Sequence, residues 1–369
     1  MTALAVAGSL TAQQAALTAS SIVAAQLPSG AIPWYAGGPL DPWDHVQSAM
    51  GLTVAGRLDE AVAAYEWSRS AQRPDGTWAM AYDGDTVTDA HTDANFGAYL
   101  ATGVWHHWRA TGDRGQAERM WPTVDAGIDA VLRLQRSDGS IPWAVGDDGR
   151  PSDESFLTGC SSIQLSVRCA LALAGVVEDP RPQWRAPLAL LRHAVRDHPE
   201  AFSPKPTHAM DWYYPVLTGA RTGSEAHQHL AARWQEFVVA DLGVHCVSDH
   251  PWVTGGETAE LVLALAAIGR HGDARALLAS MQHLREDDGS YWTGLVYADG
   301  LRWPVERTTW TGATVLLAAD AISGATPAAG LFRGDGLPAA DPLPSLSFLS
   351  SLTTLSTSEV DPCPCLLAS

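Results

Sequence analysis

The chain has 369 residues, of which 46 % are hydrophobic, and this content suffices for one large or two ordinary domains. Its 41 acidic residues against 23 basic ones give a formal net charge of −18, so nucleic acid and other polyanions would meet net repulsion. No apolar run approaches the roughly eighteen residues that a membrane span requires. We therefore expect a protein that neither inserts into membranes nor binds nucleic acid.

The amino terminus is rich in alanine but lacks the basic segment of a signal peptide, and polar residues interrupt any apolar segment. We interpret residues 11–25 as a helix. The five cysteines form an odd set with no disulfide framework, which suits a reducing compartment; they are Cys160, Cys169, Cys246, Cys363 and Cys365. We therefore expect a cytoplasmic protein.

A glycine-containing turn recurs along the chain. It reads QLPSGAIPWYA from Gln26, QRPDGTWAMAY from Gln72, QRSDGSIPWAV from Gln135 and REDDGSYWTGLVY from Arg285. Its glycines are separated by 46, 63 and 150 residues, and the last gap corresponds to about three periods of fifty. The same spacing of glutamine, glycine and an aromatic residue marks the repeats of squalene and terpene cyclases, which raises the question whether the chain is a cyclase.

Two kinds of helix alternate around these turns. Amphipathic patterns at residues 11–25, 58–72, 121–135 and 273–285 indicate outer helices. Nearly all-apolar patterns at residues 45–56, 95–108, 161–177, 212–220, 258–269 and 309–322 indicate buried inner helices. This alternation predicts an all-α protein, an (α/α)6 toroid or barrel of six helix-pair repeats, in which the amino-terminal helix is the outer partner of the last repeat.

The composition changes near residue 324, where proline, serine and threonine become frequent and the helical periodicity is lost. We therefore expect a single catalytic barrel domain over residues 1–323 and a disordered tail over residues 324–369.

Acidic residues lie at or just before the start of every predicted inner helix. They are Asp44, Asp93, Glu154, Asp211, Glu257 and Glu306. Capping of the helix explains any single acid in such a place. In this barrel, however, all inner helices begin at one end, so six carboxylates are expected around one cavity. Many of the fifteen tryptophans are interleaved with them, and turns do not require tryptophan.

Paired carboxylates beside aromatic side chains are typical of enzymes that cleave glycosidic bonds. Asp44 and Asp211 each neighbour a tryptophan, which raises the pKa of a carboxyl towards that of a general acid. Glu257 follows two glycines that allow close approach of a ligand, which suits a general base. We predict that the substrate is bound by Trp34, Tyr35, Trp43, His45, Asp93, Asn95, Glu154, Trp212, Tyr213, Trp252, Glu306 and Trp310.

Terpene cyclases and prenyltransferases are the alternatives, because they use the same barrel. The sequence has neither the Asp-any-Asp-Asp proton donor of one cyclase class nor the Asp-Asp-any-any-Asp magnesium motif of the other. The Asp-any-Cys zinc pair of protein prenyltransferases is absent from every inner-helix start, and the histidines form no convincing metal set. We expect no metal and no cofactor. A non-catalytic carbohydrate- or lipid-binding barrel is a further alternative.

The chain resembles an actinobacterial family often labelled prenyltransferase-like or squalene-cyclase-like because of these turns. The matching strings include IPWYAGGPLDPWDH, TDANFGAYLATGVWHHW, MDWYYPVLTGA and WVTGGETAEL, and the resemblance covers residues 20–325. Members are similar to α-endomannosidases that cut a methylated mannose polysaccharide. The resemblance implies hydrolysis of internal α-(1→4)-mannosidic bonds, an oligo- or polysaccharide partner, and catalytic residues at Asp44 and Glu257.

Overall fold

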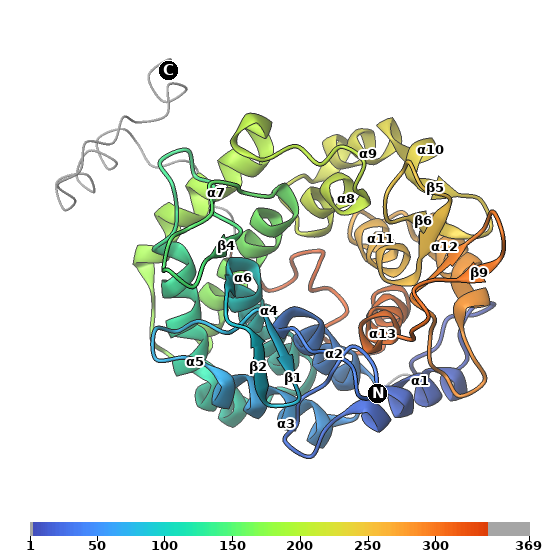
Figure 1. Ribbon diagram of the computed structural model, residues 1–369, viewed down its shortest axis with the longest axis horizontal. Helices are drawn as coiled ribbons and strands as arrows, with labels where there is room; N and C mark the ends of the chain where they lie inside the picture. The colour runs from blue at the N-terminus through green and yellow to red at the C-terminus, as the bar shows by residue number, and fades with distance from the viewer. Residues whose placement is uncertain (1–2, 339–369) are drawn as a thin grey trace.

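The computed structural model describes residues 3–338, and over this range the chain is mostly helical, as the sequence predicts. An inner layer of helices consists of α2 (Pro42–Val54), α4 (Ala94–Thr111), α6 (Leu157–Val176), α8 (Ala209–Leu217), α11 (Gly255–Ala267) and α13 (Thr309–Ser323). Each of these helices contacts the next in chain order, and α13 contacts α2 (Figure 1). The inner helices therefore form a closed ring.

An outer helix covers each helix of the ring. The outer helices are α1 (Ala12–Ala25), α3 (Leu58–Ala71), α5 (Arg114–Leu132), α7 (Arg185–Asp197), α9 (Gly223–Ala232) and α12 (His271–Ser280). The first of them, α1, packs against α13, the last helix of the ring, as expected from the sequence. The remaining helical segments are short: η1 (Pro182–Trp184), η2 (Pro199–Ala201), α10 (Trp234–Phe237) and η3 (Met281–Leu284).

Short antiparallel strands occupy the polar segments that join outer to inner helices. β1 (Ala81–Asp83) pairs with β2 (Thr86–Asp89), and β3 (Thr92–Asp93) pairs with β4 (Ala144–Val145). A five-stranded sheet has the order β5 (Val238–Val239), β6 (Gly243–His245), β7 (Trp252–Thr254), β8 (Gly294–Val296) and β9 (Leu301–Arg302). Because β3 runs directly into α4 and β7 into α11, these strands lie at the end of the ring where the inner helices begin.

The repeated turns join neighbouring outer helices. The Gln26 side chain donates to the carbonyl of Gly30 in its own turn and to the carbonyl of Glu60 in α3, both at 2.9 Å. The next two turns repeat these bonds, from Gln72 to Gly76 and Thr123 of α5, and from Gln135 to Gly139 and Pro187 of α7. The glycine of the fourth turn lies against the backbone of α1. The turn therefore has a structural role, because it joins neighbouring outer helices, and its presence does not indicate a cyclase.

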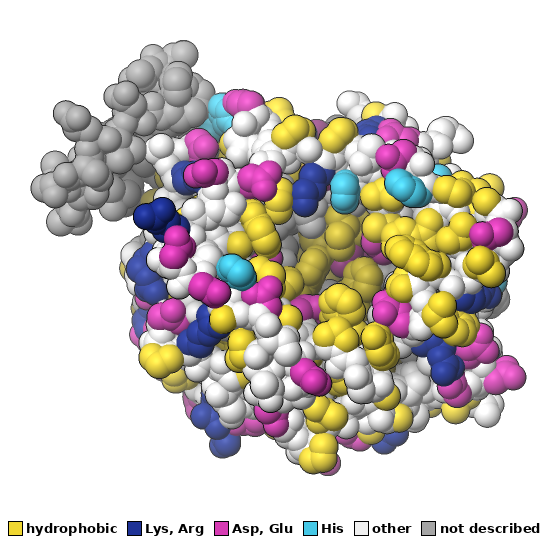
Figure 2. All heavy atoms as spheres, viewed as in Figure 1, with side chains coloured by type: hydrophobic (Ala, Val, Ile, Leu, Met, Phe, Trp, Pro, Cys, Tyr) yellow, Lys and Arg dark blue, Asp and Glu magenta, His cyan; other side chains and the backbone are white. Residues whose placement is uncertain are grey.

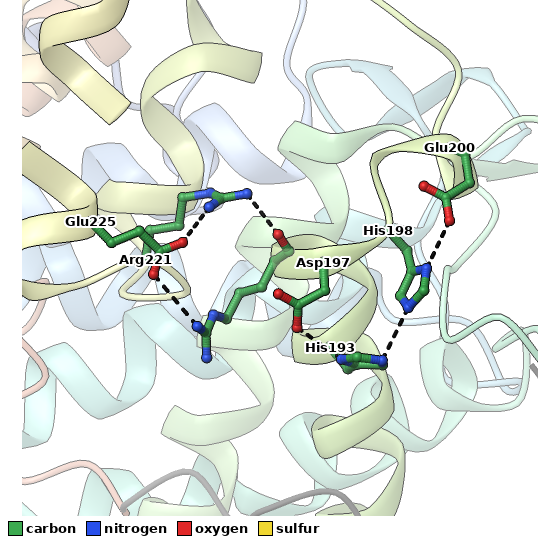
Figure 3. A network of polar contacts seen from close by, with 7 residues as sticks. His193, Asp197, His198, Glu200, Arg221 and Glu225 are labelled. Carbon is green, nitrogen blue, oxygen red and sulfur yellow. Dashed lines mark hydrogen bonds and ion pairs between the residues drawn. The ribbon is translucent and has the colours of Figure 1, made fainter. Parts of the chain in front are cut away.

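A polar network on the outer layer connects α7 with α9 (Figure 3). Arg221 contacts the Glu225 carboxylate and donates to the carbonyl of Arg196 at 2.7 Å. At the end of α7, the Nε2 atoms of His193 and His198 are 3.0 Å apart, and each ring contacts a carboxylate through Nδ1. The contacts of Arg221 therefore link the end of α7 to the start of α9, and the histidine contacts order the turn that follows α7.

The folded domain extends beyond residue 323, where we expected it to end. Asp320 of α13 accepts hydrogen bonds from the backbone nitrogen and the hydroxyl of Thr326, at 2.8 and 2.7 Å. Ala328 and Leu331 are buried. Residues 324–338, which we expected to belong to a disordered tail, therefore pack against the ring, and the rest of that predicted tail lies outside the described residues.

Helix α6 is long and apolar enough to cross a membrane by length and composition alone, which the sequence analysis did not anticipate. However, 72 % of its most apolar window is buried inside the protein. Contacts with α4, α5, α7 and α8 cover it. We therefore interpret α6 as a core helix of the ring.

Candidate active site

Three of the predicted acids occupy the same place in their helices. Asp44, Asp211 and Glu257 are each the third residue, of α2, α8 and α11 respectively. The cap of α2 is Asp41, which accepts hydrogen bonds from the backbone nitrogens of Trp43 and Asp44 at 2.8 and 2.9 Å. Capping therefore does not explain Asp44, whose carboxyl is left for another role.

The Asp44 carboxyl is half-buried and lies near several other carboxyls. Burial raises its pKa well above the ordinary value, and repulsion from neighbouring carboxylates raises it further; these are Asp41, Glu260, Glu257 and Glu306. A carboxyl that keeps its proton near neutral pH can protonate the oxygen of a leaving group. Asp44 has the electrostatic setting of a general acid.

Glu257 offers an acceptor that the protein leaves unused. Its side chain is 6 % exposed, and its Oε2 atom has no hydrogen-bond partner among the described residues. A buried polar atom without a partner is costly, so this oxygen is ready to bind water or a sugar hydroxyl. The preceding Gly256 has a different role from the one that we expected: a Cβ there would lie 2.1 Å from the Trp310 ring, so the glycine makes room for Trp310.

Asp211 lines a cavity of about 180 Å³ at the first turns of α4, α6 and α8. Its carboxylate accepts hydrogen bonds from the hydroxyl and the backbone nitrogen of Thr158, at 2.5 and 3.2 Å, and burial raises its pKa. Asp93 and Asn95 line the same cavity. Asp93 also caps α4, and burial raises its pKa to about 7.

Figure 2 shows that the face bearing the inner-helix starts is hollowed at its centre and lined largely by hydrophobic side chains. Trp43, the second residue of α2, lines the cavity, and its ring contacts Phe96 and Tyr99. A second, wider groove of about 550 Å³ lies beside α1 and α13 and includes Tyr35 and Glu306. Because α2 stands between α13 and α4 in the ring, the two hollows lie on either side of it.

Two residues that we expected to bind substrate are structural. His45 is fully buried; its Nδ1 accepts from the backbone nitrogen of Ile32 at 3.0 Å, and its Nε2 donates to the carbonyl of Ala64 at 2.9 Å. Burial lowers its pKa to about 4. Trp212 is 1 % exposed and stacks on Phe237 with ring centroids 5.0 Å apart. Both side chains point into the protein because their own helices are packed on more than one side.

Three further residues that we expected to bind substrate lie at the edge of the candidate active site. Glu154 is exposed in the segment before α6, whereas Asp44 is half-buried and Glu257 is buried. Trp34 donates from its indole nitrogen to Asp41 at 2.6 Å, so it supports the cap of α2. Trp252 is half-buried on β7 and packs against Trp303.

Glu260 is the acid that sequence reasoning missed. It lies one turn after Glu257 on α11, is 1 % exposed, and accepts hydrogen bonds from the hydroxyls of Tyr213 and Tyr214 at 2.5 and 2.7 Å. Burial raises its pKa to about 8, although both hydroxyls oppose this shift. Tyr213, which we expected to bind substrate, is completely buried, and its hydroxyl donates its hydrogen bond to Glu260. A glutamate inside the apolar string TAELVLALAAIG was the available signal, because an acid is rarely buried without a partner.

The raised pKa of Glu260 predicts how stability depends on pH. In the unfolded chain a glutamate titrates near 4.5, so between about pH 4.5 and 8 only the folded state keeps this proton. Stability is therefore lost as the pH rises through about 8, by up to about 1.4 kcal/mol per pH unit for one such group. Buried histidines such as His45 affect stability only below about pH 6.5, the ordinary pKa of an imidazole, and do not mask the effect.

We expect the free energy of unfolding, measured by chemical denaturation, to fall between pH 6.5 and 8.5. The Glu260→Gln variant keeps a polar side chain against both tyrosines but cannot release a proton, so its decrease should be smaller. An equal decrease in both proteins would contradict this account of Glu260.

The chain is similar to known glycoside hydrolases. It is 56 % identical to the MMP endo-(1,4)-3-O-methyl-alpha-D-mannosidase of Mycolicibacterium hassiacum over 327 residues, which cover 89 % of this chain and 91 % of that protein. No family model matches the chain.

Among solved structures, a wild-type glycosidase matches with a TM-score of 0.67 at 16 % identity, over 85 % of this chain and 97 % of that one. The GH63 mannosylglycerate hydrolase from Thermus thermophilus, in complex with glucose, matches with a TM-score of 0.64 at 14 % identity, over 82 % of this chain and 99 % of that one. These two matches support the fold. The relationship to α-endomannosidases is confirmed, whereas the prenyltransferase-like label receives no support.

Proposed function

This chain belongs to the family of the M. hassiacum MMP endo-(1,4)-3-O-methyl-α-D-mannosidase, and on that premise we propose that it hydrolyses internal α-(1→4) bonds of a 3-O-methylated mannose polysaccharide. Glycoside hydrolysis needs one carboxyl that gives a proton and one that takes a proton or attacks the sugar. The observation that carries the proposal is the pair formed by Asp44 and Glu257. One carboxyl has a strongly raised pKa, and the other has a buried, unpartnered oxygen.

In the proposed reaction, Asp44 donates its proton to the glycosidic oxygen as the bond to the anomeric carbon breaks. Glu257 supports the other face of the sugar, as the base that activates water or as the nucleophile. Asp211 is the second candidate for the acid, but it already accepts two hydrogen bonds from Thr158, which hold its carboxylate in place. We therefore assign Asp211 to substrate positioning beside the reacting pair.

Aromatic side chains around the acids suit the apolar faces of sugar rings. Trp43 and Trp310 are half-buried, and the indole nitrogen of each lacks a hydrogen-bond partner among the described residues. Each can therefore donate to a sugar hydroxyl while its ring contacts the substrate. This combination explains why tryptophans accompany the carboxylates in the sequence.

We further infer that the six helix pairs form an (α/α)6 barrel, which the closed ring of inner helices and the glycosidase matches support. We also propose that the protein works in a reducing compartment such as the cytoplasm. Cys160, Cys169 and Cys246 are free thiols, which suits such a compartment.

The proposed function is tested by incubating the purified protein with 3-O-methylated α-(1→4)-mannooligosaccharides and analysing the products by mass spectrometry. We expect internal cleavage to shorter oligosaccharides without added metal. Parallel incubations with geranylgeranyl diphosphate and squalene test the cyclase alternative. Cyclised terpene together with intact sugar would contradict the proposal.

The pH dependence of the reaction should respond to Glu306. Its carboxylate raises the pKa of Asp44, and a general acid works only while it holds its proton. Replacing Glu306 by Gln removes this repulsion, so Asp44 should lose its proton at a lower pH. We expect the alkaline limb of kcat/KM against pH to move to lower pH in Glu306→Gln. The control is Glu118→Gln on the outer helix α5, which should leave the profile unchanged; a shared profile in all three proteins would contradict the role of Asp44.

A further inference from the structure

Lys205 is the only lysine in the sequence, and it lines the cavity beside Asp211. A proline on each side of it restricts the backbone, and its carbonyl accepts a hydrogen bond from the backbone nitrogen of His208 at 3.1 Å. The segment between η2 and α8 therefore holds the base of this side chain in place. Neither the acid nor the base of the proposed reaction requires its ammonium group.

An aromatic ring, and not an acid, orients the ammonium group of Lys205. Its Nζ lies 3.4 Å from the centroid of the Phe156 ring, which in turn packs against Trp143 with centroids 5.6 Å apart. Burial raises the pKa of Asp211, and the charge of Lys205 opposes this shift without a direct ion pair. Among residues 3–338, Nζ forms no hydrogen bond and no ion pair. Its N–H donors are therefore available to a ligand in the cavity.

Two further polar groups at this cavity lack partners. Asn95 on α4 is 6 % exposed, and its Oδ1 atom has no hydrogen-bond partner among the described residues. The indole nitrogen of Trp143, directly before β4, is also buried without a partner in that part of the chain. Leaving a buried donor or acceptor unpaired is unfavourable, so the cavity favours a ligand that both donates and accepts hydrogen bonds.

The mixed charges around the cavity favour a neutral ligand. Asp93 and Asp211 line it together with Lys205, so an anion would meet two carboxyl groups and a cation would meet the ammonium group. A hydroxyl group suits all of these side chains, because it accepts from an ammonium or indole N–H and donates to an amide or carboxyl oxygen. At about 180 Å³, the cavity is smaller than the roughly 300–1,000 Å³ of pockets for drug-sized ligands, and it therefore suits a single sugar unit.

We propose that this cavity is a subsite for one sugar unit of the polysaccharide, and that Lys205 fixes the orientation of that unit by donating hydrogen bonds from Nζ to its ring substituents. Asn95 and Trp143 supply the complementary acceptor and donor. The inference rests on the proposed function and adds to it a substrate-binding residue outside the carboxyl groups. It also accounts for a lysine without an ionic partner in a chain that has 41 acidic residues.

Because the sequence has one lysine, an amine-selective reagent can monitor this side chain alone. The Glu257→Gln variant would be acetylated with N-hydroxysuccinimidyl acetate, with and without α-(1→4)-mannotetraose, and modification of Lys205 would be followed by peptide mass spectrometry. We expect the bound oligosaccharide to slow acetylation of Lys205 severalfold and to leave the α-amino group, the internal reference, unaffected. An unchanged rate at Lys205 while calorimetry shows the oligosaccharide bound would overturn the inference.

Substitution separates a binding role of Lys205 from a structural one. Lys205→Met keeps the apolar stem but removes every donor, so kcat/KM for mannotetraose should fall about ten- to a hundredfold, mainly through KM, the range for a hydrogen bond to a charged group. Lys205→Arg restores N–H donors and should recover much of this loss. Arg275→Gln removes an exposed positive charge from α12 and should keep native kcat/KM. Native kcat/KM in Lys205→Met would contradict the proposed contact.

A binding experiment distinguishes failure of this inference from failure of the proposed function. Calorimetry with α-(1→4)-mannotetraose would compare Glu257→Gln with the double variant Glu257→Gln/Lys205→Met. Weaker binding by the double variant supports the subsite even if the native protein cleaves no mannooligosaccharide. Equal binding by both variants, together with hydrolysis by the native protein, would leave the hydrolase standing and remove the subsite. No binding by either variant would contradict both proposals.

Discussion

The Asp44→Asn and Glu257→Gln variants are each expected to lose about 10²–10⁴-fold in kcat on a mannooligosaccharide substrate, the range for removing a general acid or base. Asn at position 44 cannot donate the proton that the leaving oxygen needs. Gln at position 257 cannot accept a proton or attack carbon. Both replacements keep the size of the side chain, so melting temperature and oligosaccharide binding should stay near those of the native protein.

The double variant Asp44→Asn/Glu257→Gln sharpens this test. Residues that act as a unit are not additive, so the double variant should be about as slow as the slower single variant. Asp211→Asn should lose less than Asp44→Asn, because Thr158 holds that carboxyl in a positioning role. Glu154→Gln is the matched control at an exposed acid and should keep its activity. Native kcat in both Asp44→Asn and Glu257→Gln would remove these two residues from the catalytic role.

The largest effect on stability is expected at the glycines of the repeated turns. Gly76 has φ +90°, and a Cβ there would lie 2.5 Å from the carbonyl oxygen of Ala126 in α5. Gly76→Ala therefore combines the strain of a positive φ, about 1–2 kcal/mol, with overlap against a backbone that must shift, about 1–3 kcal/mol more. We expect a loss of about 3 kcal/mol in the free energy of unfolding.

Gly149 supplies the control for this prediction. Its φ is +75°, but a Cβ there would meet nothing within 4 Å. Gly149→Ala should therefore show the strain alone, about 1–2 kcal/mol. Chemical denaturation of both variants measures the difference. Equal losses would mean that contact between turn and outer helix does not hold the scaffold together.

The ring of inner helices was predictable because its signal is local. A helix that is apolar on every side, such as residues 309–322, must be buried wherever it lies in the chain. The repeated turn was equally visible, since Gln26 and Gly30 make their first bond within one turn. The sequence also indicated that the amino-terminal helix packs against the last inner helix, because that inner helix has no outer helix after it in the chain.

The site was less predictable because it depends on contacts between distant segments. Sequence spacing placed Glu257 at the start of α11 but did not show that Gly256 leaves room for Trp310. Nor did it show that Glu260, one turn deeper, meets the hydroxyl of Tyr213 on α8. His45 was expected to bind substrate, yet it follows Asp44 directly in α2, and adjacent residues of a helix point in different directions.

The most direct test of the account is a crystal structure of the Glu257→Gln variant with a 3-O-methylated α-(1→4)-mannotetraose bound. We expect the oligosaccharide to cross the hollow at the inner-helix starts, with a glycosidic oxygen within hydrogen-bonding distance of the Asp44 carboxyl. Residue 257 should face the same sugar unit from the other side. An oligosaccharide bound outside the ring, or bound within it with every glycosidic oxygen out of reach of Asp44, would contradict the assignment of the catalytic pair.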